Sequence, residues 1–398
     1  MKRFKMALIG VGARGEGLYR VALKQRDYVD FVAVCDSYMD RCETLAEKMV
    51  QDGRPRPACY SDYRQCIEES KPDCILVSTG WNMHIEITMY AMKHGIPVAC
   101  EVGGAYDVAS LWDLVHCYEE TKTPVMMMEN CCYGRLELLA LEMKRRGILG
   151  EIVHCEGGYR HDLREEVAHG KENRHYRLQE YIQRNCENYP THEIGPIAKL
   201  LDINCGNRFV SLYSMASKSV GLADYVQKHN IEHLKDVQFK QGDVVTTLLR
   251  CANGETVTIT LDTTLPRYYS RGFLVQGTEG LICEENQSVF LEKDCTGDHW
   301  DWTSNFSNVG KYYEQYDHRL WKDFHPGDEG HGGLDALVFD AFFEALDQGT
   351  PMPIDVYDMA TWMVITALSE ESIATGKEVE FPDFTEGKWQ EKSNTFEL

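Results

Sequence analysis

The chain has 398 residues, more than a single hydrophobic core usually holds, so two domains are expected. Its composition, 43% hydrophobic and 26% charged, is typical of a globular protein, and no apolar run approaches the length needed to cross a membrane. The net charge of -22 opposes binding to nucleic acid or to an anionic membrane, which leaves a small molecule as the expected ligand.

Fifteen cysteines raise the question of disulfides or metal. None are spaced as Cys-x-x-Cys, and several lie in apolar runs, among them Cys35, Cys74, Cys100 and Cys155. We therefore expect reduced thiols in the core and, without a His-Glu-x-x-His or similar cluster, no metal site. The first predicted strand starts within a few residues of Met1, which leaves no room for a signal peptide, so the expected location is cytoplasmic.

The apolar run at residues 4–9 ends in a Gly-x-Gly-x-x-Gly motif at Gly10, Gly12 and Gly15, followed by helical spacing. This pattern predicts a strand, a tight turn and a helix that bind a dinucleotide. Gly10 permits the turn, Gly12 lets the backbone approach a pyrophosphate, and Gly15 lets helix and strand pack closely. Arg14 is counted among the cofactor-binding residues. A glycine loop that merely starts a helix is the alternative interpretation.

A second apolar run, at residues 31–35, ends at Asp36, 21 residues beyond Gly15. A carboxylate at this place accepts hydrogen bonds from the adenosine ribose hydroxyls and repels a 2'-phosphate. Strand, spacing and acid together therefore predict NAD, rather than NADP, as the cofactor.

Strand and helix patterns alternate up to residue 130. Helical spacing at 38–50, 87–91 and 107–120 separates apolar strands at 74–79, 96–101 and 124–130. Continuous apolar strands are typical of parallel sheets that are covered on both faces. We predict an α/β fold, with a Rossmann-type doubly wound parallel sheet over residues 1–130.

In this architecture ligands collect at the carboxyl ends of the strands. The polar and aromatic side chains expected there are Asp36, Thr79, Trp81, His84, Glu101, Glu129 and Asn130. Each one alone has an ordinary explanation, as a packed aromatic ring, a helix-start histidine or a solvated acid. Together they lie where a bound dinucleotide is expected, and the set predicts cofactor contacts.

Residues 131–398 predict a second, α+β domain for substrate binding and oligomerisation. A helix at 133–147 and a strand at 150–159 precede the charged segment 160–184, which is expected to be a long exposed loop near a site. Alternating strands at 210–215, 243–250, 256–262, 272–276 and 280–283 predict a large, mostly antiparallel open-faced sheet, with a hairpin at Asn253-Gly254. Final helices are expected at 336–347 and 355–376.

Two features of this domain leave choices open. Residues 294–330 are rich in aromatic side chains, with Trp300, Trp302, Tyr312, Tyr313, Tyr316 and Trp321. They line a carbohydrate site or pack across a subunit boundary, and the pattern does not decide which. A sheet with one face uncovered would expose apolar surface, so a homodimer or homotetramer is expected.

The motifs resemble those of the Gfo/Idh/MocA oxidoreductases over essentially the whole chain. Within that group the chain resembles glycoside hydrolase family 109, NAD-dependent glycosidases known chiefly as α-N-acetylgalactosaminidases. The shared motifs are Met128-Glu129-Asn130-x-x-Tyr133-Gly134-Arg135, Gly150-Glu151-Ile152-Val153-His154, Tyr159-x-His161-Asp162-Leu163-Arg164, Tyr189-Pro190-Thr191-His192, Tyr269-Ser270-Arg271-Gly272 and His331-Gly332-Gly333.

The chain departs from both groups at two places. Sugar dehydrogenases of the wider family carry Glu-Lys-Pro where this chain has Glu101-Val102-Gly103, so the lysine that assists their hydride transfer is missing. Family 109 tends to have Glu-Val-Pro there and a glycine after the motif histidine, where this chain has Gly103 and Glu193. Both differences bear on the substrate pocket.

The resemblance implies a redox-neutral hydrolysis by transient C3 oxidation, elimination at C1, water addition and re-reduction, on N-acetylhexosaminides or related glycosides. It assigns C2 proton transfer to Tyr159, proton exchange to His192, positioning to Tyr189 and Tyr269, and sugar or nicotinamide contacts to Glu129. Histidine suits proton exchange because imidazole titrates near neutrality. Without the resemblance, a helix-capping histidine, core tyrosines and a solvated glutamate explain the same residues.

Two other functions stay open at this point. One is an NAD-dependent sugar or cyclitol dehydrogenase that releases reduced cofactor, and Val102 argues against it. The other is a non-enzymatic NAD or sugar sensor that kept the fold, because fold alone does not fix function. The presence of His192 and the motif tyrosines argues against a sensor.

Overall fold

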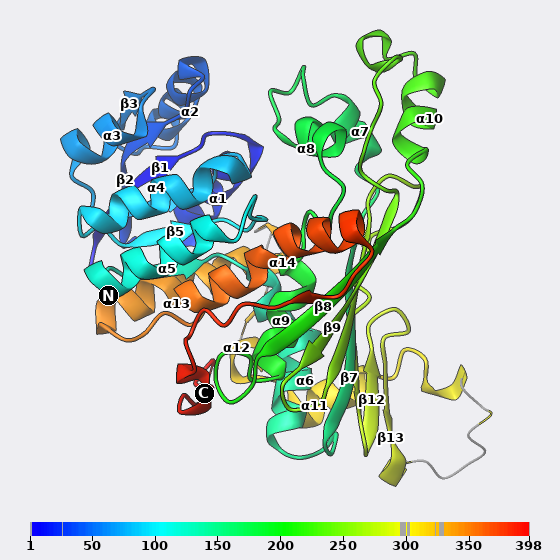
Figure 1. Ribbon diagram of the computed structural model, residues 1–398. Coiled ribbons are helices and arrows are strands. Elements are labelled where there is room, and N and C mark those ends of the chain that lie inside the picture. Colours follow the sequence, from blue (N-terminus) through cyan, green and yellow to red (C-terminus); the bar gives the residue numbers. More distant parts are fainter. Residues whose placement is uncertain are drawn as a thin grey trace. The chain divides into compact units, whose positions relative to one another are not determined.

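The computed structural model describes residues 2–25, 27–294, 300, 303–322, 324–325 and 330–397. The chain forms two compact units (Figure 1). The first contains the described residues of 1–130, 326–360 and 395–398, and the second those of 131–325 and 361–394. The sequence assigns 326–360 to the second domain, whereas the structure places the described residues 330–360 in the first unit. The physical reason is aromatic packing, because Phe343 contacts Phe4 and Tyr28, each at a ring-centre distance of 5.3 Å.

The first unit is built on a six-stranded sheet with the order β3-β2-β1-β4-β5-β6. Its strands are β1 (Phe4–Ile9), β2 (Val29–Cys35), β3 (Ala58–Tyr60), β4 (Cys74–Val77), β5 (Val98–Cys100) and β6 (Val125–Met127). All neighbouring strands are parallel. The strand order reverses between β1 and β4, so the doubly wound fold is confirmed, with its ligand-binding edge at this point.

Helices connect successive strands of this sheet. They are α1 (Ala13–Gln25), α2 (Met39–Gln51), α3 (Tyr63–Ser70), α4 (Trp81–Lys93) and α5 (Ala109–Thr121), and the returning segment adds α13 (Leu334–Gln348). Every residue of β4 is buried, as its continuous apolar run predicts for a sheet covered on both faces. The free thiols of Cys35, Cys74 and Cys100 lie in this core.

The second unit is built on an eight-stranded sheet with the order β13-β12-β11-β7-β10-β9-β8-β14. Its strands are β7 (Ile152–Arg160), β8 (Phe209–Ala216), β9 (Val244–Cys251), β10 (Thr256–Asp262), β11 (Leu274–Gly277), β12 (Gly280–Cys283), β13 (Ser288–Leu291) and β14 (Val379–Glu380). Among the described strands of this sheet, only the β7–β10 pair is parallel, which confirms a mostly antiparallel sheet. The β9–β10 hairpin turns at Gly254, whose φ of 105° suits glycine.

One face of this sheet is covered and the other is open. Helix α9 (Thr191–Leu200) packs on β7, and α6 (Arg135–Arg145) packs on α9. The open face carries Met215 and Leu248, which are 61% and 50% exposed and lie on adjacent strands. The open-faced sheet expected from the alternating strands is therefore confirmed.

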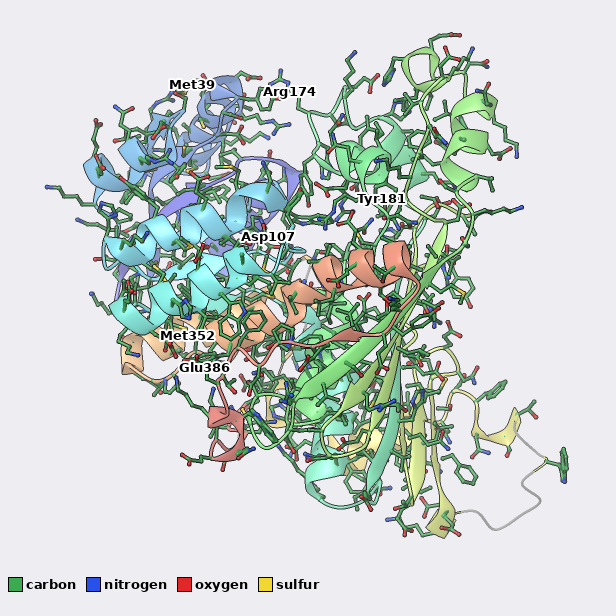
Figure 2. The ribbon with its side chains drawn as sticks, viewed as in Figure 1. Met39, Asp107, Arg174, Tyr181, Met352 and Glu386 are labelled. Carbon is green, nitrogen blue, oxygen red and sulfur yellow. The ribbon has the colours of Figure 1, made fainter. Side chains whose placement is uncertain are left out.

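The charged segment 160–184 contains two helices that the sequence pattern does not predict, α7 (Arg164–Ala168) and α8 (Arg177–Gln183). Both are too short to show helical periodicity. Tyr181 of α8, labelled in Figure 2, is buried, and its hydroxyl lies 2.6 Å from the hydroxyl of Thr263. Part of the expected exposed loop thus belongs to the core of the second unit.

The aromatic segment packs largely within the second unit. Its helices are α11 (Gly310–Tyr316) and α12 (Arg319–Lys322). Trp321 donates a hydrogen bond to the Tyr133 carbonyl at 2.9 Å, and the guanidinium of Arg135 lies 4.1 Å from the ring centre of Tyr313. Trp300 is exposed, and Trp302 lies outside the described residues. These contacts give several of the aromatic rings a structural role.

The remaining helices of the second unit are α10 (Gly221–Lys228) and most of α14 (Val356–Thr375), which begins in the first unit. Among the residues that the structure describes, no helix combines the length and the hydropathy that a membrane crossing requires.

Candidate functional site

The glycine loop after β1 has the shape that a dinucleotide requires. A Cβ on Gly10 would lie 2.5 Å from the carbonyl carbon of Ser78, and one on Gly15 would lie 2.1 Å from the Gly10 oxygen. Both positions therefore exclude a side chain because backbone packs against them. At Gly12 the nearest atom to such a Cβ is 3.9 Å away, on Arg41. The open backbone at Gly12 fits the close approach of a pyrophosphate to the start of α1.

Asp36 lies directly after β2 and is held by backbone amides. One carboxylate oxygen accepts from the Val11 amide at 2.8 Å and the other from the Tyr38 amide at 2.9 Å. Arg41 lies 3.8 Å from the same carboxylate, and its guanidinium lies 5.0 Å from the centre of the Tyr38 ring. The sequence analysis missed Arg41. A guanidinium at this end of the site would attract a 2'-phosphate if the acid were removed.

The strand-end residues after β4 support the loop. His84 is buried, and its Nε2 lies 3.1 Å from the Thr79 carbonyl oxygen. Burial lowers the pKa of His84 to about 4, so the ring is neutral and braces the backbone at Thr79. Trp81 opens α4, and a Cβ on Gly103 would lie 2.6 Å from its indole. Glycine at 103 therefore makes room for Trp81.

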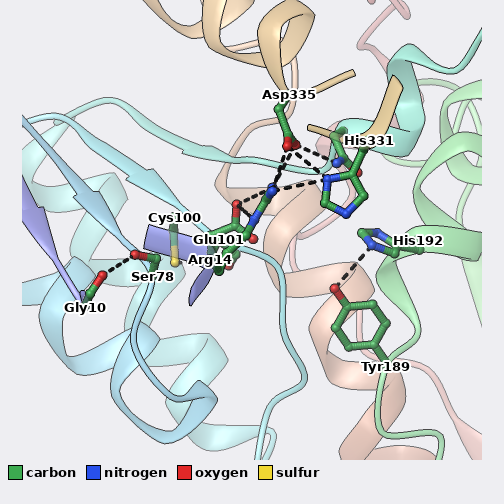
Figure 3. A network of polar contacts seen from close by, with 10 residues as sticks. Gly10, Arg14, Ser78, Cys100, Glu101, Tyr189, His192, His331 and Asp335 are labelled. Atoms are coloured by element: carbon green, nitrogen blue, oxygen red, sulfur yellow. Dashed lines mark hydrogen bonds and ion pairs between the residues drawn. The ribbon is translucent and has the colours of Figure 1, made fainter. Parts of the chain in front are cut away.

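Arg14 contacts three polar side chains of the first unit, those of Glu101, Asp335 and His331 (Figure 3). Its guanidinium lies 2.8 Å from Glu101, which follows β5, and donates to both carboxylate oxygens of Asp335 at 2.8 and 2.9 Å. Asn130, after β6, donates to the same carboxylate at 2.7 Å. Glu101 and Asp335 are buried. The structure thus brings the predicted residues Arg14, Glu101 and Asn130 together around Asp335, which the sequence analysis missed.

Glu129 lies between β6 and Asn130 and is fully buried. It belongs to the same strand-end edge of the first unit as Glu101 and Asn130, because parallel strands end at one edge. The predicted contacts of Glu129 with sugar or nicotinamide stay predictions.

The second unit gathers the predicted tyrosines and histidine. Tyr159 lies next to the last residue of β7, and its ring centre lies 4.4 Å from that of Tyr189, 5.6 Å from His192 and 6.4 Å from Tyr269. The Tyr189 hydroxyl lies 3.3 Å from His192 Nε2 at the start of α9 (Figure 3). Tyr159, Tyr189 and His192 are buried, whereas Tyr269 is half-exposed. One strand end, one helix start and one loop therefore form a single aromatic cluster.

Two residues of the charged segment complete this cluster, and the sequence analysis gave neither a role. His161 Nδ1 lies 3.1 Å from the Tyr159 hydroxyl. Arg177 opens α8, forms an ion pair with Glu166 at 3.0 Å and lies 5.2 Å from the Tyr189 ring centre. Burial raises the pKa of Tyr159, and the charge of Arg177 acts in the opposite direction. Burial also lowers the pKa of His161, which favours its neutral ring.

Glu193, the departure after His192, has a packing explanation. A Cβ on Gly157 of β7 would lie 2.9 Å from the Glu193 Cβ. Glycine on the strand therefore lets α9 approach with a glutamate at this position. Glu193 is buried and belongs to the contact between α9 and β7.

Comparison with known proteins shows the family of this chain. Residues 133–391 match the model for the C-terminal domain of glycosyl hydrolase 109, and residues 4–129 match the oxidoreductase family with an NAD-binding Rossmann fold. The chain belongs to glycosyl hydrolase family 109. The predicted family, NAD-dependent glycoside hydrolases within the Gfo/Idh/MocA group, and the predicted cofactor NAD are both confirmed.

Relatives from this family align with nearly the whole of this chain. A glycosyl hydrolase family 109 protein of Stenotrophomonas maltophilia is 38% identical, over 99% of this chain and 92% of its own. An α-N-acetylgalactosaminidase of Tannerella forsythia is 36% identical, over 99% of this chain and 89% of its own. A levoglucosan dehydrogenase solved with NADH and levoglucosan shares the fold, with a TM-score of 0.73, 19% identity and coverage of 96% and 100%.

The Asp36 geometry gives a testable prediction. Replacing Asp36 by Ala removes the acid and leaves Arg41 beside the adenosine end, so NAD should bind about tenfold more weakly while NADP binds more tightly. Calorimetric titration with both cofactors measures this change. In the double variant D36A/R41A the gain for NADP should disappear. Unchanged affinity and selectivity in D36A would remove Asp36 from the cofactor site.

Proposed function

We propose that the chain cleaves N-acetylhexosaminides or related glycosides by transient oxidation at C3 of the sugar. The observation that carries the proposal is the cluster of Tyr159, Tyr189, His192 and His161 in the second unit, which supplies proton acceptors in contact with one another. The name α-N-acetylgalactosaminidase, borne by the Tannerella forsythia relative, supports the substrate class. We assign substrate binding to residues 131–325 and 361–394, and cofactor binding to the first unit.

Bound NAD would supply reversible hydride acceptance, which makes C3 a ketone and renders the C2 hydrogen acidic. The glycine loop and Asp36 would hold its pyrophosphate and adenosine ribose, with Arg14, Thr79, Glu101 and Asn130 at the remaining strand ends. Trp81 and His84, both on α4, would complete the cofactor site next to Thr79.

The protein's part in the chemistry is proton transfer. His192 accepts the C3 hydroxyl proton, and the Tyr189 hydroxyl beside its Nε2 orients the imidazole. Tyr159 accepts the C2 proton as the group at C1 leaves. Tyr159 can accept this proton only as a phenolate, and little phenolate is present at neutral pH, because tyrosine has an ordinary pKa of about 10 and burial raises it further. The neutral His161 accepts the phenolic proton at 3.1 Å, and the charge of Arg177 stabilises the developing phenolate.

Tyr269 and Glu129 are assigned binding roles. The ring of Tyr269 lies edge-on to His161 at 5.2 Å and is half-exposed, so it suits contact with a sugar face. Glu129, with a buried carboxylate, suits the sugar hydroxyls or the nicotinamide. No pair of flanking carboxylates is needed, in contrast to direct glycoside displacement.

The proton-transfer roles of Tyr159 and His192 predict a loss of turnover when either side chain is removed. Replacing Tyr159 by Phe, or His192 by Ala, should lower kcat for an aryl N-acetylhexosaminide by about 10²-fold to 10⁴-fold, because each removes a proton acceptor. Tyr312→Phe is the matched control, since Tyr312 is equally buried in the second unit but its hydroxyl donates to Asp294. Full activity of Y159F would exclude the assigned role.

The same assay separates hydrolysis from oxidation. The wild type should release aglycone without accumulating NADH, whereas a sugar or cyclitol dehydrogenase accumulates NADH in step with substrate. Absorbance of reduced cofactor during the time course decides between the two.

We also propose that the open face of the second sheet forms a homodimer or homotetramer, because Met215 and Leu248 expose apolar side chains on it. Light scattering at micromolar concentration should show an oligomer for the wild type and a smaller species for M215K/L248K. Val50→Lys is the control, because Val50 is similarly exposed on α2 of the first unit. A monomeric wild type would contradict this proposal.

A further inference from the structure

We infer that Asp335 is a positioning residue that, through Arg14 and Glu101, makes the cofactor site prefer oxidised over reduced NAD. Asp335 lies in the first turn of α13, on the segment that returns to the first unit near the end of the chain. No role for it follows from the glycine motif or from the proposed proton transfers. The inference rests on NAD binding and is independent of the sugar chemistry.

The contacts of Asp335 tie three elements to one carboxylate. Both of its oxygens accept from Arg14, at 2.8 and 2.9 Å, in a bidentate pair. Asn130 donates to one oxygen at 2.7 Å, and His331 Nδ1 lies 2.9 Å from the other. Arg14 in turn lies 2.8 Å from Glu101. Bidentate pairing restricts the guanidinium of Arg14 to one orientation. Asp335 therefore positions Arg14 and, through Arg14, its contact with Glu101.

Asp335, Arg14, Glu101 and Asn130 form the Asp335 cluster, which lies at the strand ends where the nicotinamide half of a dinucleotide is expected. Asp36 after β2 marks the adenosine end, and the glycine loop after β1 holds the pyrophosphate. The other half of a dinucleotide then extends over the ends of β4, β5 and β6, on the far side of the strand-order reversal. Glu101 follows β5 and Asn130 follows β6. Asp335 therefore connects the loop with the edge where hydride is exchanged.

The charges of the cluster do not cancel. One guanidinium faces two carboxylates, which leaves a net charge of -1 when His331 is neutral. Although burial alone would raise it, hydrogen bonds from His331 and Arg14 hold the pKa of Asp335 well below its usual range. Both carboxylates are buried, so solvent screens them little.

The two forms of the cofactor would differ in charge at the nicotinamide ring, which is expected beside this cluster. The nicotinamide ring is positive in NAD⁺ and neutral in NADH, whereas the pyrophosphate and adenosine are the same in both. A net negative cluster therefore stabilises NAD⁺ relative to NADH. For an enzyme that takes a hydride and returns it, this preference keeps the resting form oxidised and ready for substrate.

The test compares affinities for the two cofactor forms. Holoprotein is equilibrated with known mixtures of free NAD⁺ and NADH at one mildly alkaline pH, without substrate, and the bound ratio is measured after rapid desalting. Asp335→Asn makes the cluster neutral and should lower the preference for NAD⁺ by about threefold to tenfold. Arg14→Gln makes it more negative and should raise the preference by a similar factor. Asp335→Glu and Arg14→Lys, which keep the charge, should stay near the wild-type ratio.

Asp340→Asn is the matched control on the same helix, because Asp340 accepts from Tyr28 and makes no contact with Arg14 among the described residues. Its bound ratio should equal that of the wild type. A purely structural role of the cluster would weaken both cofactor forms equally and leave every ratio unchanged, which would overturn the inference. Shifts of the same sign in D335N and R14Q would also overturn it. If D335N does not fold, R14Q against R14K decides, and a glycosidase that fails in assay leaves this test intact.

Discussion

The close approach of Gly10 to the backbone at Ser78 and Thr79 is the contact on which the cofactor unit depends. It joins the end of β1 to the end of β4, the two strands between which the sheet order reverses. Any side chain at Gly10 would collide with backbone at 2.5 Å, so the loop, the start of α1 and the position of Arg14 all follow from this one contact. Asp36 accepts from the Val11 amide of this loop, and Glu101 and Asp335 contact Arg14 at the start of α1.

In the second unit, too, a glycine allows a close approach between two elements. Gly157 lets α9 lie close to β7, which brings His192 and Tyr189 to Tyr159 at the end of that strand. Burial of these rings raises the cost of ionising a tyrosine, and the nearby guanidinium of Arg177 offsets part of that cost. Packing and proton chemistry therefore depend on the same few contacts.

Local patterns predicted most of the fold and, within the candidate site, pointed to the glycine loop and Asp36. The glycines and Asp36 were found because their roles depend on spacing within one strand, turn and helix. Asp335 was missed because its partner Arg14 is 321 residues away, and no local pattern encodes that pairing. Arg177 and His161 lie in a segment without aliphatic periodicity, and β3, β13 and β14 are too short to show alternation. The motif resemblance, rather than periodicity, singled out Tyr159 and His192.

The account depends most on oxidation at C3, because only a ketone there makes the C2 hydrogen acidic enough for Tyr159 to remove. Hydrolysis of an aryl N-acetylhexosaminide in heavy water, followed by mass and magnetic resonance analysis of the released sugar, tests this directly. Deuterium at C2 of the product is the predicted result. Complete retention of the original C2 hydrogen, with glycoside cleavage intact, would contradict the mechanism.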